Sequence, residues 1–556
     1  MRRTLIAVAA VLVMAGAGAY YALFILPDQQ FRAAIDRTVA ALPKGVTAHY
    51  GEARYAVSSR TATVTDLLFQ LPDGVRLTVD RIVVENPAQD FGDRWNAARE
   101  KPDALRPDWA VPVADRIVLT GLKLAGAKSS ATTASMSLAG LRIYPWPLHR
   151  PAVPPLDNLV QALEAFSQAA DRVQAYQNFR RMQVQGAPDA GQSVDAAPLS
   201  PAEKDALGQK IIDSLPPILR GGSAMLLSFG YDSLDIAGLE MTVSSKAADT
   251  GKDSAERLSM RKFHAGALDR GNGGASTVEE LAADESGSGK SSIDRATMGN
   301  LTLRDMAMRL VNGDPLSMAI LDGVSVGPME LYGTAENPIV GVPSRTDKIA
   351  LSDLSFDRSF LKSFGIAVTG SRIDVAAARS SPQKALLERY GLRSLTTSLT
   401  MAFQWDPDRR SASLHDVSFD IAELGSIQLY ADLVNIGPAK TGEAGEVAFS
   451  KATLRYRDAT LIDRLLAGGG KQTPDQLQQM RMAYVMNVLK AFGPVATDPK
   501  LAGSVKALQD FAKAPRNMTI TLAPPAPVPL KDMKGVAAQG PKKLIDTLGL
   551  SVSANQ

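Results

Sequence analysis

Three short motifs in this chain resemble sites of chemistry, and the first resembles a phosphate-binding loop. Gly289-Lys290-Ser291 matches the end of a P-loop, in which backbone amides and the lysine hold a nucleotide phosphate. A P-loop also needs a glycine five residues before Gly289, but position 284 is Asp, whose carboxylate would repel a phosphate. No apolar strand leads into the motif. We interpret it as part of a flexible Gly/Ser linker.

The second motif resembles a calcium-binding loop. The segment DRGNGGASTVEE puts Asp269, Gly274 and Glu280 at the first, sixth and twelfth positions of such a loop. Its third and fifth positions are Gly271 and Gly273, which have no side-chain oxygen for a cation. The segment is therefore better explained as a glycine-rich turn.

The third motif pair is typical of penicillin-interacting serine enzymes. Ser359-Phe-Leu-Lys362 matches S-x-x-K, and the tripeptide at 440–442 matches K-T-G. However, S-x-x-K occurs again at 381–384, and no S-D-N element lies between Lys362 and position 440. These matches indicate coincidence rather than a nucleophile.

Histidine spacing gives no metal site. The four histidines are scattered and there is no cysteine to complete a ligand set; they are His49, His149, His264 and His415. The motifs for hydrolases, dinucleotide-binding folds and zinc proteases are absent from the sequence. We therefore expect no enzyme activity and assign no catalytic, cofactor-binding or metal-binding residue.

The strongest signal is an apolar run at the N-terminus. Residues Leu5 to Leu26 carry no charge, and 22 helical residues cover about 33 Å, enough for a hydrocarbon core of about 30 Å. Arg2 and Arg3 precede the run, which places the N-terminus in the cytoplasm and the rest of the chain across the membrane. The sequence thus predicts a single membrane anchor at 1–27.

A cleaved signal peptide is the alternative explanation of this run. The small-residue triplets at 15–17 and 17–19 both resemble cleavage sites. The run continues for seven apolar residues after Ala19, which favours a retained anchor. A lipid anchor on cysteine is excluded because the chain has no cysteine.

Composition limits the class of partner. The chain has 61 Lys and Arg against 58 Asp and Glu, with a net charge of +3 and the two signs interspersed. A nucleic-acid surface would need clustered basic residues, so we expect no nucleic-acid partner. Without cysteine no disulfide forms, and the fold must be held by burial of its mostly small aliphatic side chains.

A six-residue unit recurs along the chain, with the pattern apolar-x-[Asp/Gly]-apolar-x-apolar. Asp or Gly at its third position predicts a bulge or bend between two half-buried strand pieces. Such a bend would turn the flanking apolar residues, for example Leu351 and Phe356, to one side. The eight copies are 64–69, 119–124, 138–143, 236–241, 303–308, 321–326, 351–356 and 414–419.

Helical patterns interrupt the strand patterns. Apolar spacing and capping boxes beginning at Ser200 and Thr473 predict helices at 28–42, 155–182, 200–215, 473–492, 499–512 and 541–548. The Gly- and Ser-rich stretch 246–292 predicts a mobile loop, with a short helix at 277–283.

The expected segments are the anchor (1–27), a β-rich region (28–150), a helical insertion with a linker (151–215), a β-rich region containing that loop (216–460), a helical block (461–515), and a C-terminal segment of strand, proline-rich stretch and helix (516–556).

This pattern resembles the AsmA-like and YdgA-like envelope proteins of Gram-negative bacteria. The resemblance is carried by the run Leu5 to Leu26, the helix with Phe31, Ile35 and Val39, the segment 56–67, the units 303–308, 351–356 and 414–419, and the strand 452–458. It implies an elongated, curled antiparallel sheet with an apolar trough, behind a single transmembrane helix. The fold class expected is therefore mainly β with helical insertions (α+β).

The resemblance implies a role in lipid handling or outer-membrane biogenesis. We expect a single-pass protein of the bacterial inner membrane, held by Leu5 to Leu26, with most of the chain in the periplasm. A lipid ligand or an apolar segment would bind in the sheet trough. The alternative is an anchored structural or interaction protein, with a closed core, that docks an envelope partner through its helical blocks.

Overall fold

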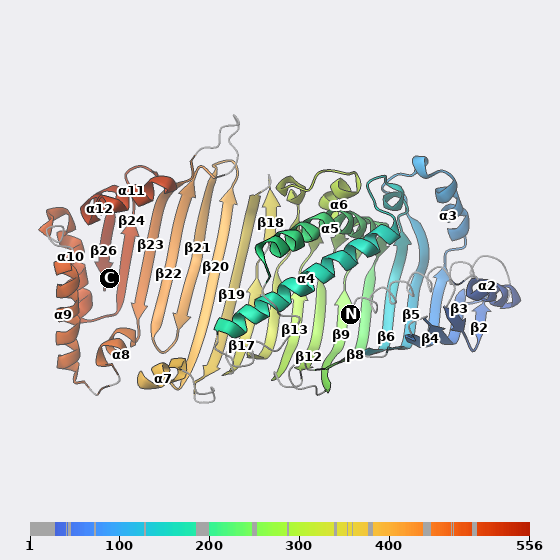
Figure 1. Cartoon of the computed structure of the whole chain (residues 1–556), viewed down its shortest axis with the longest axis horizontal. Coiled ribbons are helices and arrows are strands. Elements are labelled where there is room, and N and C mark those ends of the chain that lie inside the picture. Colours follow the sequence, from blue (N-terminus) through green and yellow to red (C-terminus); the bar gives the residue numbers. More distant parts are fainter. Residues whose placement is uncertain are drawn as a thin grey trace. The chain divides into compact units, whose positions relative to one another are not determined.

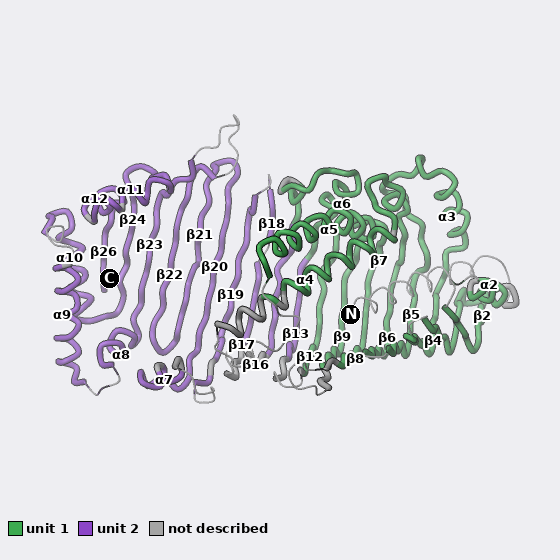
Figure 2. Tube along the Cα trace, viewed as in Figure 1, with its two compact units in different colours: residues 1–286, 300–324 green, residues 287–299, 325–556 purple. Residues whose placement is uncertain are grey.

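A computed structural model of the chain confirms that the protein is mainly β, with a large antiparallel sheet and additional helices (Figure 1). It describes residues 28–555 except 41, 43–45, 72–73, 127–128, 185–198, 247–252, 286–288, 338–341, 353, 358–359, 376–381, 437–445, 469, 471 and 492–496. The chain divides into two compact units (Figure 2). Unit 1 comprises residues 1–286 and 300–324, and unit 2 comprises residues 287–299 and 325–556.

Unit 1 is built on an antiparallel meander. Its strands pair in the order β3–β4–β5–β6–β8–β9–β12. The short strands β1 and β2 pair with β3, and β7, β10, β11 and β14 extend from one end of β6. The strands are β1 (Thr47–His49), β2 (Ala53–Ala56), β3 (Thr61–Gln70), β4 (Arg76–Pro87), β5 (Val111–Ala125), β6 (Ser129–Ile143), β7 (Phe229–Tyr231), β8 (Ser233–Lys246), β9 (Asp253–Ala265), β10 (Leu268–Asp269), β11 (Asn272–Gly273), β12 (Ser276–Glu285) and β14 (Leu301–Thr302).

Helix α2 closes the apolar face of the first strands of unit 1. Phe31 of α2 is 2% exposed and packs against strand residues that include Leu67, Leu77 and Val79. Residues Ile35 and Val39 of the same helix pack against this core. The helices of unit 1 are α2 (Asp28–Ala40), α3 (Phe91–Glu100), η1 (Pro102–Ala104), η2 (Trp146–His149), α4 (Leu156–Val184), α5 (Pro201–Ser228), α6 (Arg304–Val311) and η4 (Met318–Leu321).

Unit 2 is a second antiparallel meander. Its strands pair in the order β13–β16–β17–β19–β20–β21–β22–β23–β24–β26. The strands are β13 (Gly289–Met298), β15 (Ser325–Val326), β16 (Met329–Asn337), β17 (Val342–Leu351), β18 (Leu354–Asp357), β19 (Phe360–Asp374), β20 (Ser394–Asp406), β21 (Ser411–Ile421), β22 (Gly425–Val434), β23 (Ala448–Asp458), β24 (Asn517–Leu522), β25 (Val528–Pro529) and β26 (Leu550–Ala554).

The helices of unit 2 gather at the strand ends and beyond β24 (Figure 1). They are α7 (Pro382–Arg389), α8 (Leu461–Ala467), α9 (Pro474–Ala491), η6 (Pro499–Leu501), α10 (Ala502–Lys513), η7 (Leu530–Asp532), α11 (Met533–Ala538) and α12 (Pro541–Leu548). The predicted capping boxes are confirmed. Ser200 and Glu203 cap α5 reciprocally, and Thr473 and Gln476 exchange the same two hydrogen bonds before α9.

A row of extra residues crosses unit 1 and explains the repeated sequence unit. At one position in every strand of the meander, a single residue interrupts the alternation of side chains between the two faces of the sheet. These positions lie side by side across the strands. As a result, apolar residues three apart, such as Leu119 and Leu122, share a face. The chain is left-handed at this level in alternate strands, with φ of 52°, 63°, 63° and 50° at Asp66, Gly121, Gly238 and Glu280. The row, which we call the kink row, is Asp66, Asp80, Gly121, Ala134, Gly238, Arg261 and Glu280.

At Gly238 in the kink row, the backbone conformation and the close approach of Ala134 both require glycine. A Cβ added there would lie 2.8 Å from the Cβ of Ala134, in a backbone with φ of +63°. Gly238→Ala therefore combines a left-handed penalty of about 1–2 kcal/mol with overpacking of about 1–3 kcal/mol. Gly74, with φ of +79° and no atom within 4 Å of an added Cβ, is the matched control. Urea unfolding should show the larger loss for Gly238→Ala; equal losses would mean that the kink row is not closely packed.

The expected mobile loop at 246–292 is wrong for the described residues. Strands β9 and β12 and the start of β13 occupy most of it, and β9 is paired on both sides, by β8 and β12. The short helix expected at 277–283 is also wrong, since these residues belong to β12. A stretch with few apolar residues can still form these strands, because only alternate positions, such as Leu258 and Met260, must face the apolar side of the sheet.

The six-residue unit holds for some copies and fails for others. Residues Asp66, Gly121, Gly140, Gly238 and Asp416 have positive φ within strands, as predicted. The copy at 303–308 forms most of helix α6 instead, whose buried Ala307, Leu310 and Val311 follow a helical spacing. The copy at 321–326 runs from the last residue of η4 through a turn, with Gly323 at φ of 80°, into the two-residue strand β15. Asp353 of the copy at 351–356 lies outside the described residues.

The predicted anchor also lies outside the described residues. Among the helices of the described part of the chain, none is both long enough and apolar enough to span a bilayer.

Candidate functional site

The structure describes only some residues of the motifs that resembled catalytic sites. Gly289, Lys290 and Ser291 begin β13, so they form a strand and not a loop before a helix. Lys362 lies in β19, while Ser359, Ser381 and the tripeptide at 440–442 lie outside the described residues.

The segment that resembled a calcium loop is a pair of short strands followed by β12. Asp269 ends β10 and accepts a 2.6 Å hydrogen bond from the hydroxyl of Tyr144. Burial works against ionisation of Asp269, but hydrogen bonds from Tyr144 and Arg270 outweigh it and lower the pKa of this carboxyl group. Asp269 is therefore an internal ion-pair partner, and Glu280 lies apart from it in β12.

The four histidines lie on β1, η2, β9 and β21. The Nδ1 atom of His264 is 2.9 Å from Oδ1 of Asp235, and Nε2 of His415 is 3.8 Å from Oδ2 of Asp416. No group of three or more His, Asp or Glu side chains suited to a metal occurs in the described part of the chain.

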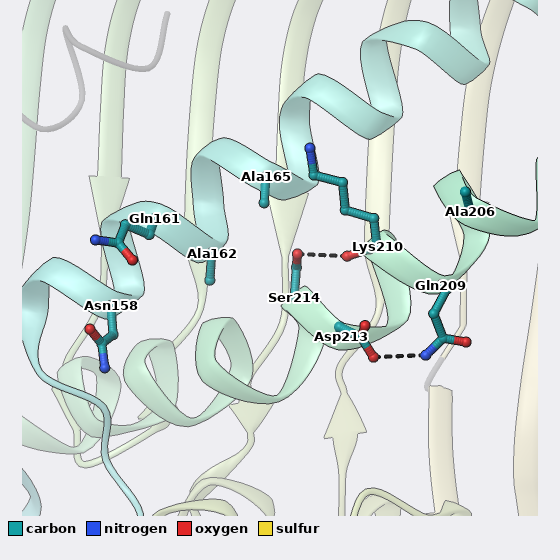
Figure 3. A pocket seen from close by; sticks show the side chains of 9 residues that line it. All are labelled: Asn158, Gln161, Ala162, Ala165, Ala206, Gln209, Lys210, Asp213 and Ser214. Atoms are coloured by element: carbon teal, nitrogen blue, oxygen red, sulfur yellow. Dashed lines mark hydrogen bonds between the residues drawn. The ribbon is translucent and has the colours of Figure 1, made fainter. Parts of the chain in front are cut away.

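A hollow of about 610 Å³ lies between α4 and α5 (Figure 3). One polar contact crosses between the two helices, since Nζ of Lys210 on α5 donates to Oε1 of Gln168 on α4 at 3.5 Å, and two more lie within α5. The amide of Gln209 donates to Asp213 at 2.8 Å, and the hydroxyl of Ser214 donates to the carbonyl of Lys210 at 2.7 Å. The facing side chains of α4 include Ala162 and Ala165, which offer only methyl groups. The hydroxyl of Ser214 and the amine of Lys210 are hydrogen-bonded to amide oxygens, and among the described residues neither has an acid or base partner that would make it a nucleophile.

The apolar face of the unit 2 sheet is the more informative surface. Residues directly opposite each other on paired strands point to the same face of a sheet. In unit 2 the strand register aligns one apolar row, which is Leu331, Ile349, Val368, Leu399, Phe419, Ile427, Tyr456 and Met518. We call the face that carries this row the apolar face.

A second row two residues further along each strand keeps the same character. It contains Leu351, Ile366, Met401, Val417, Leu429, Leu454, Ile520 and Val552. The adjoining row on the opposite face, which we call the polar face, is Glu330, Ala350, Ala367, Thr400, Ser418, Gln428, Arg455 and Thr519. The two apolar rows carry no charge, so the sheet is strongly two-sided.

Large side chains of the apolar face remain open to solvent. Leu399, Phe419 and Ile427 are neighbours on β20, β21 and β22, and they are 39%, 44% and 43% exposed. In unit 1, by contrast, Leu77 and Val79 are each 1% exposed in the core packed against α2. Contiguous exposed apolar side chains of this size are typical of a binding surface.

The helices of unit 2 explain why this area is uncovered. Helices α7 and α8 pack with a cluster that contains Val375 and Leu424, and α11 and α12 pack with one that contains Phe449 and Val528. The first pair lies at one end of the strands and the second at the other (Figure 1). Neither pair crosses the middle of β20, β21 and β22 in that view.

Helix α10 closes the margin of the apolar face at the last strands. The Oγ atom of Ser504 accepts a 3.0 Å hydrogen bond from the backbone N–H of Val552. The rings of Phe511 and Tyr456 pack edge to face, with their centroids 6.0 Å apart. Burial and then the hydrogen bond to Asp458 raise the pKa of Tyr456, so its hydroxyl stays protonated. The open part of the face is therefore centred on β20 to β22.

Sequence reasoning identified parts of this surface but not the surface itself. The unit at 414–419 and the strand pattern at 395–403 contain Phe419 and Leu399. The sequence pattern did not show that Phe419 and Leu399 lie beside Ile427, because the register between strands depends on their pairing and not on local pattern. The alternation in SIQLYADLV at 426–434 was the available signal. Phe356, which was expected to turn to the same side as Leu351, is half-buried in β18.

Among known proteins, the chain matches one family model. No curated protein and no solved structure matches the chain. A family model described as "Uncharacterized protein" matches residues 418–555, which begin in β21 and include β22 to β26.

Proposed function

We propose that this protein binds the acyl chains of lipids on the apolar face of unit 2. The observation that carries the proposal is the open, in-register row of Leu399, Phe419 and Ile427. An acyl chain placed across them would cover apolar surface that water otherwise contacts.

The energetics suit a lipid chain. Burying each methylene contributes about 0.8 kcal/mol, so six methylenes laid over these side chains contribute about 5 kcal/mol before ordering costs. Neutral aliphatic and aromatic side chains distinguish little between acyl chains of different length. The proposal is therefore that the protein recognises the acyl chain itself and binds it on the apolar face of unit 2.

The location belongs to the same proposal. The run Leu5 to Leu26, with Arg2 and Arg3 before it, supports an inner-membrane anchor with the sheet in the periplasm. The resemblance to AsmA-like and YdgA-like envelope proteins supports a role in envelope biogenesis and a curled sheet. No catalytic step is part of this function.

Photo-crosslinking at Phe419 tests the proposal. A benzoylphenylalanine placed at position 419 and irradiated in bacterial cells should form an adduct whose added mass, by mass spectrometry, is that of a lipid. The same probe at Asp420 is the matched control, because this neighbour on β21 points to the polar face, where it pairs with Ser398 and Ser426. Equal lipid adducts at both positions, or none at position 419, would contradict the proposal.

A second function, docking of a protein partner, is favoured by one helix. On α9 the side chains of Met480 and Tyr484 are 37% and 64% exposed and lie one turn apart. An anchored interaction protein would use such a surface. Loss of a co-purifying envelope protein on Tyr484→Ala, with lipid adducts at position 419 absent, would select this function over the first.

A further inference from the structure

The polar face of unit 2 contains a hollow that the acyl-binding surface does not use. It has a volume of about 480 Å³, within the range of small-molecule pockets. Strand register places it on β20 to β23, on the face opposite to Phe419. Its charged and polar lining includes Thr400, His415, Asp416, Tyr430, Lys451 and Arg455.

Two cations border this hollow. Lys451 and Arg455 lie four residues apart on β23, with Thr453 between them, so all three side chains point to the polar face. Both cations are exposed, and within the described residues neither forms a salt bridge. Lys348, which lies on the same sheet, is by contrast paired with Glu330.

A β-bulge brings an acceptor into the same hollow. Asp416 has φ of 54° at a shift in strand register, and its Oδ2 lies 3.8 Å from Nε2 of His415. The hydroxyls of Thr400 and Ser418 already bond to each other at 2.7 Å. Asp416 is 79% exposed in its side chain, so its carboxylate can accept a hydrogen bond from a ligand.

This combination selects a class of ligand. Arg and Lys together recognise a phosphate through charge-assisted hydrogen bonds. A carboxylate beside them repels a bare anion, but it accepts hydrogen bonds from hydroxyl groups. A molecule that carries one phosphate and several hydroxyls satisfies both halves of the lining.

We propose that this hollow binds a phosphorylated polyol, with the phosphate held by Arg455 and Lys451 and hydroxyl groups donating to Asp416. Glycerol phosphate, either free or as the headgroup of a phospholipid, has this chemistry. The site is independent of acyl binding, because it lies on the other face of the sheet.

The test uses the full-length chain in non-ionic detergent micelles. Isothermal titration with glycerol 1-phosphate measures binding of the free compound, and titration with micelles containing phosphatidylglycerol measures binding of the headgroup. We expect binding in at least one arm, and we expect Arg455→Gln to weaken it at least tenfold. Lys451→Gln should also weaken binding, and both variants should keep the melting temperature because both side chains are exposed.

Matched controls separate this site from general charge and from the acyl surface. Arg457→Gln removes an equal charge from the polar face of the same strand, outside the hollow lining, and should leave binding within about twofold. Phe419→Asp should leave glycerol phosphate binding unchanged. No binding in either arm, or an equal loss in Arg457→Gln and Arg455→Gln, would overturn the proposal without affecting the acyl-binding function.

Discussion

Replacing Phe419 with Asp is expected to weaken acyl-chain binding at least tenfold while the protein remains folded. Phe419 is 44% exposed between Leu399 and Ile427, so water reaches a carboxylate there when the surface is empty. Covering that carboxylate with an acyl chain would leave a charge without water or a partner, which costs several kcal/mol. Titration with a fluorescent fatty acid measures the change in affinity, and urea unfolding should change by about 0.5 kcal/mol or less.

Ser418→Asp is the matched control for this prediction. It adds the same charge to the adjacent residue, on the polar face, and should leave affinity for the fatty acid unchanged. A large loss of stability in Phe419→Asp would show that Phe419 belongs to a packed core. That result would favour the interaction protein over the lipid-binding protein.

The second large effect is expected in unit 1. Leu67 is 7% exposed in the core packed against α2, and Leu67→Ala removes side-chain contacts that the core cannot refill. A buried Leu→Ala change costs about 2–5 kcal/mol, measurable as a lower midpoint in urea.

Leu68→Ala provides the matched comparison. Leu68 is the next residue on β3, half-buried, with its side chain on the opposite face. We expect it to cost about 1 kcal/mol. Equal losses for the two leucines would mean that α2 does not cover this sheet.

Local chemistry made several elements predictable from the sequence. The capping boxes at Ser200 and Thr473 begin helices because their side chains satisfy backbone N–H groups within three residues. The bends at Asp66, Gly121 and Gly238 were predictable because glycine and aspartate adopt left-handed backbone more readily than most residues.

Elements that depend on long-range pairing were not predictable. The stretch 246–292 reads as a loop by composition, yet β9 lies between β8 and β12, and its backbone hydrogen bonds are made to both. Helix α5 was expected to end at Leu215, before Pro216 and Pro217, but it continues to Ser228. Burial of Ala224 and Leu227 against α6 stabilises that second half, and the sequence pattern alone does not show it.

The candidate site shows the same division. Alternation predicted individual two-sided strands, including the one with Leu399 and the unit with Phe419. Their alignment into one row depends on strand register. That none of the described unit 2 helices crosses the middle of this row depends on where α7, α8, α11 and α12 pack. An open surface is a property of the assembled sheet, so no local sequence motif predicts it.

Lipid mass spectrometry of the protein purified without detergent tests the central claim most directly. The chain from Asp28 to Gln556, which contains every described residue, would be expressed with an export signal in bacteria and extracted with organic solvent. Acyl-bearing lipid should be recovered in near-equimolar amount from the unchanged sequence and be lost from Phe419→Asp at equal protein recovery. Lipid-free unchanged protein, or equal lipid in both, would contradict the account.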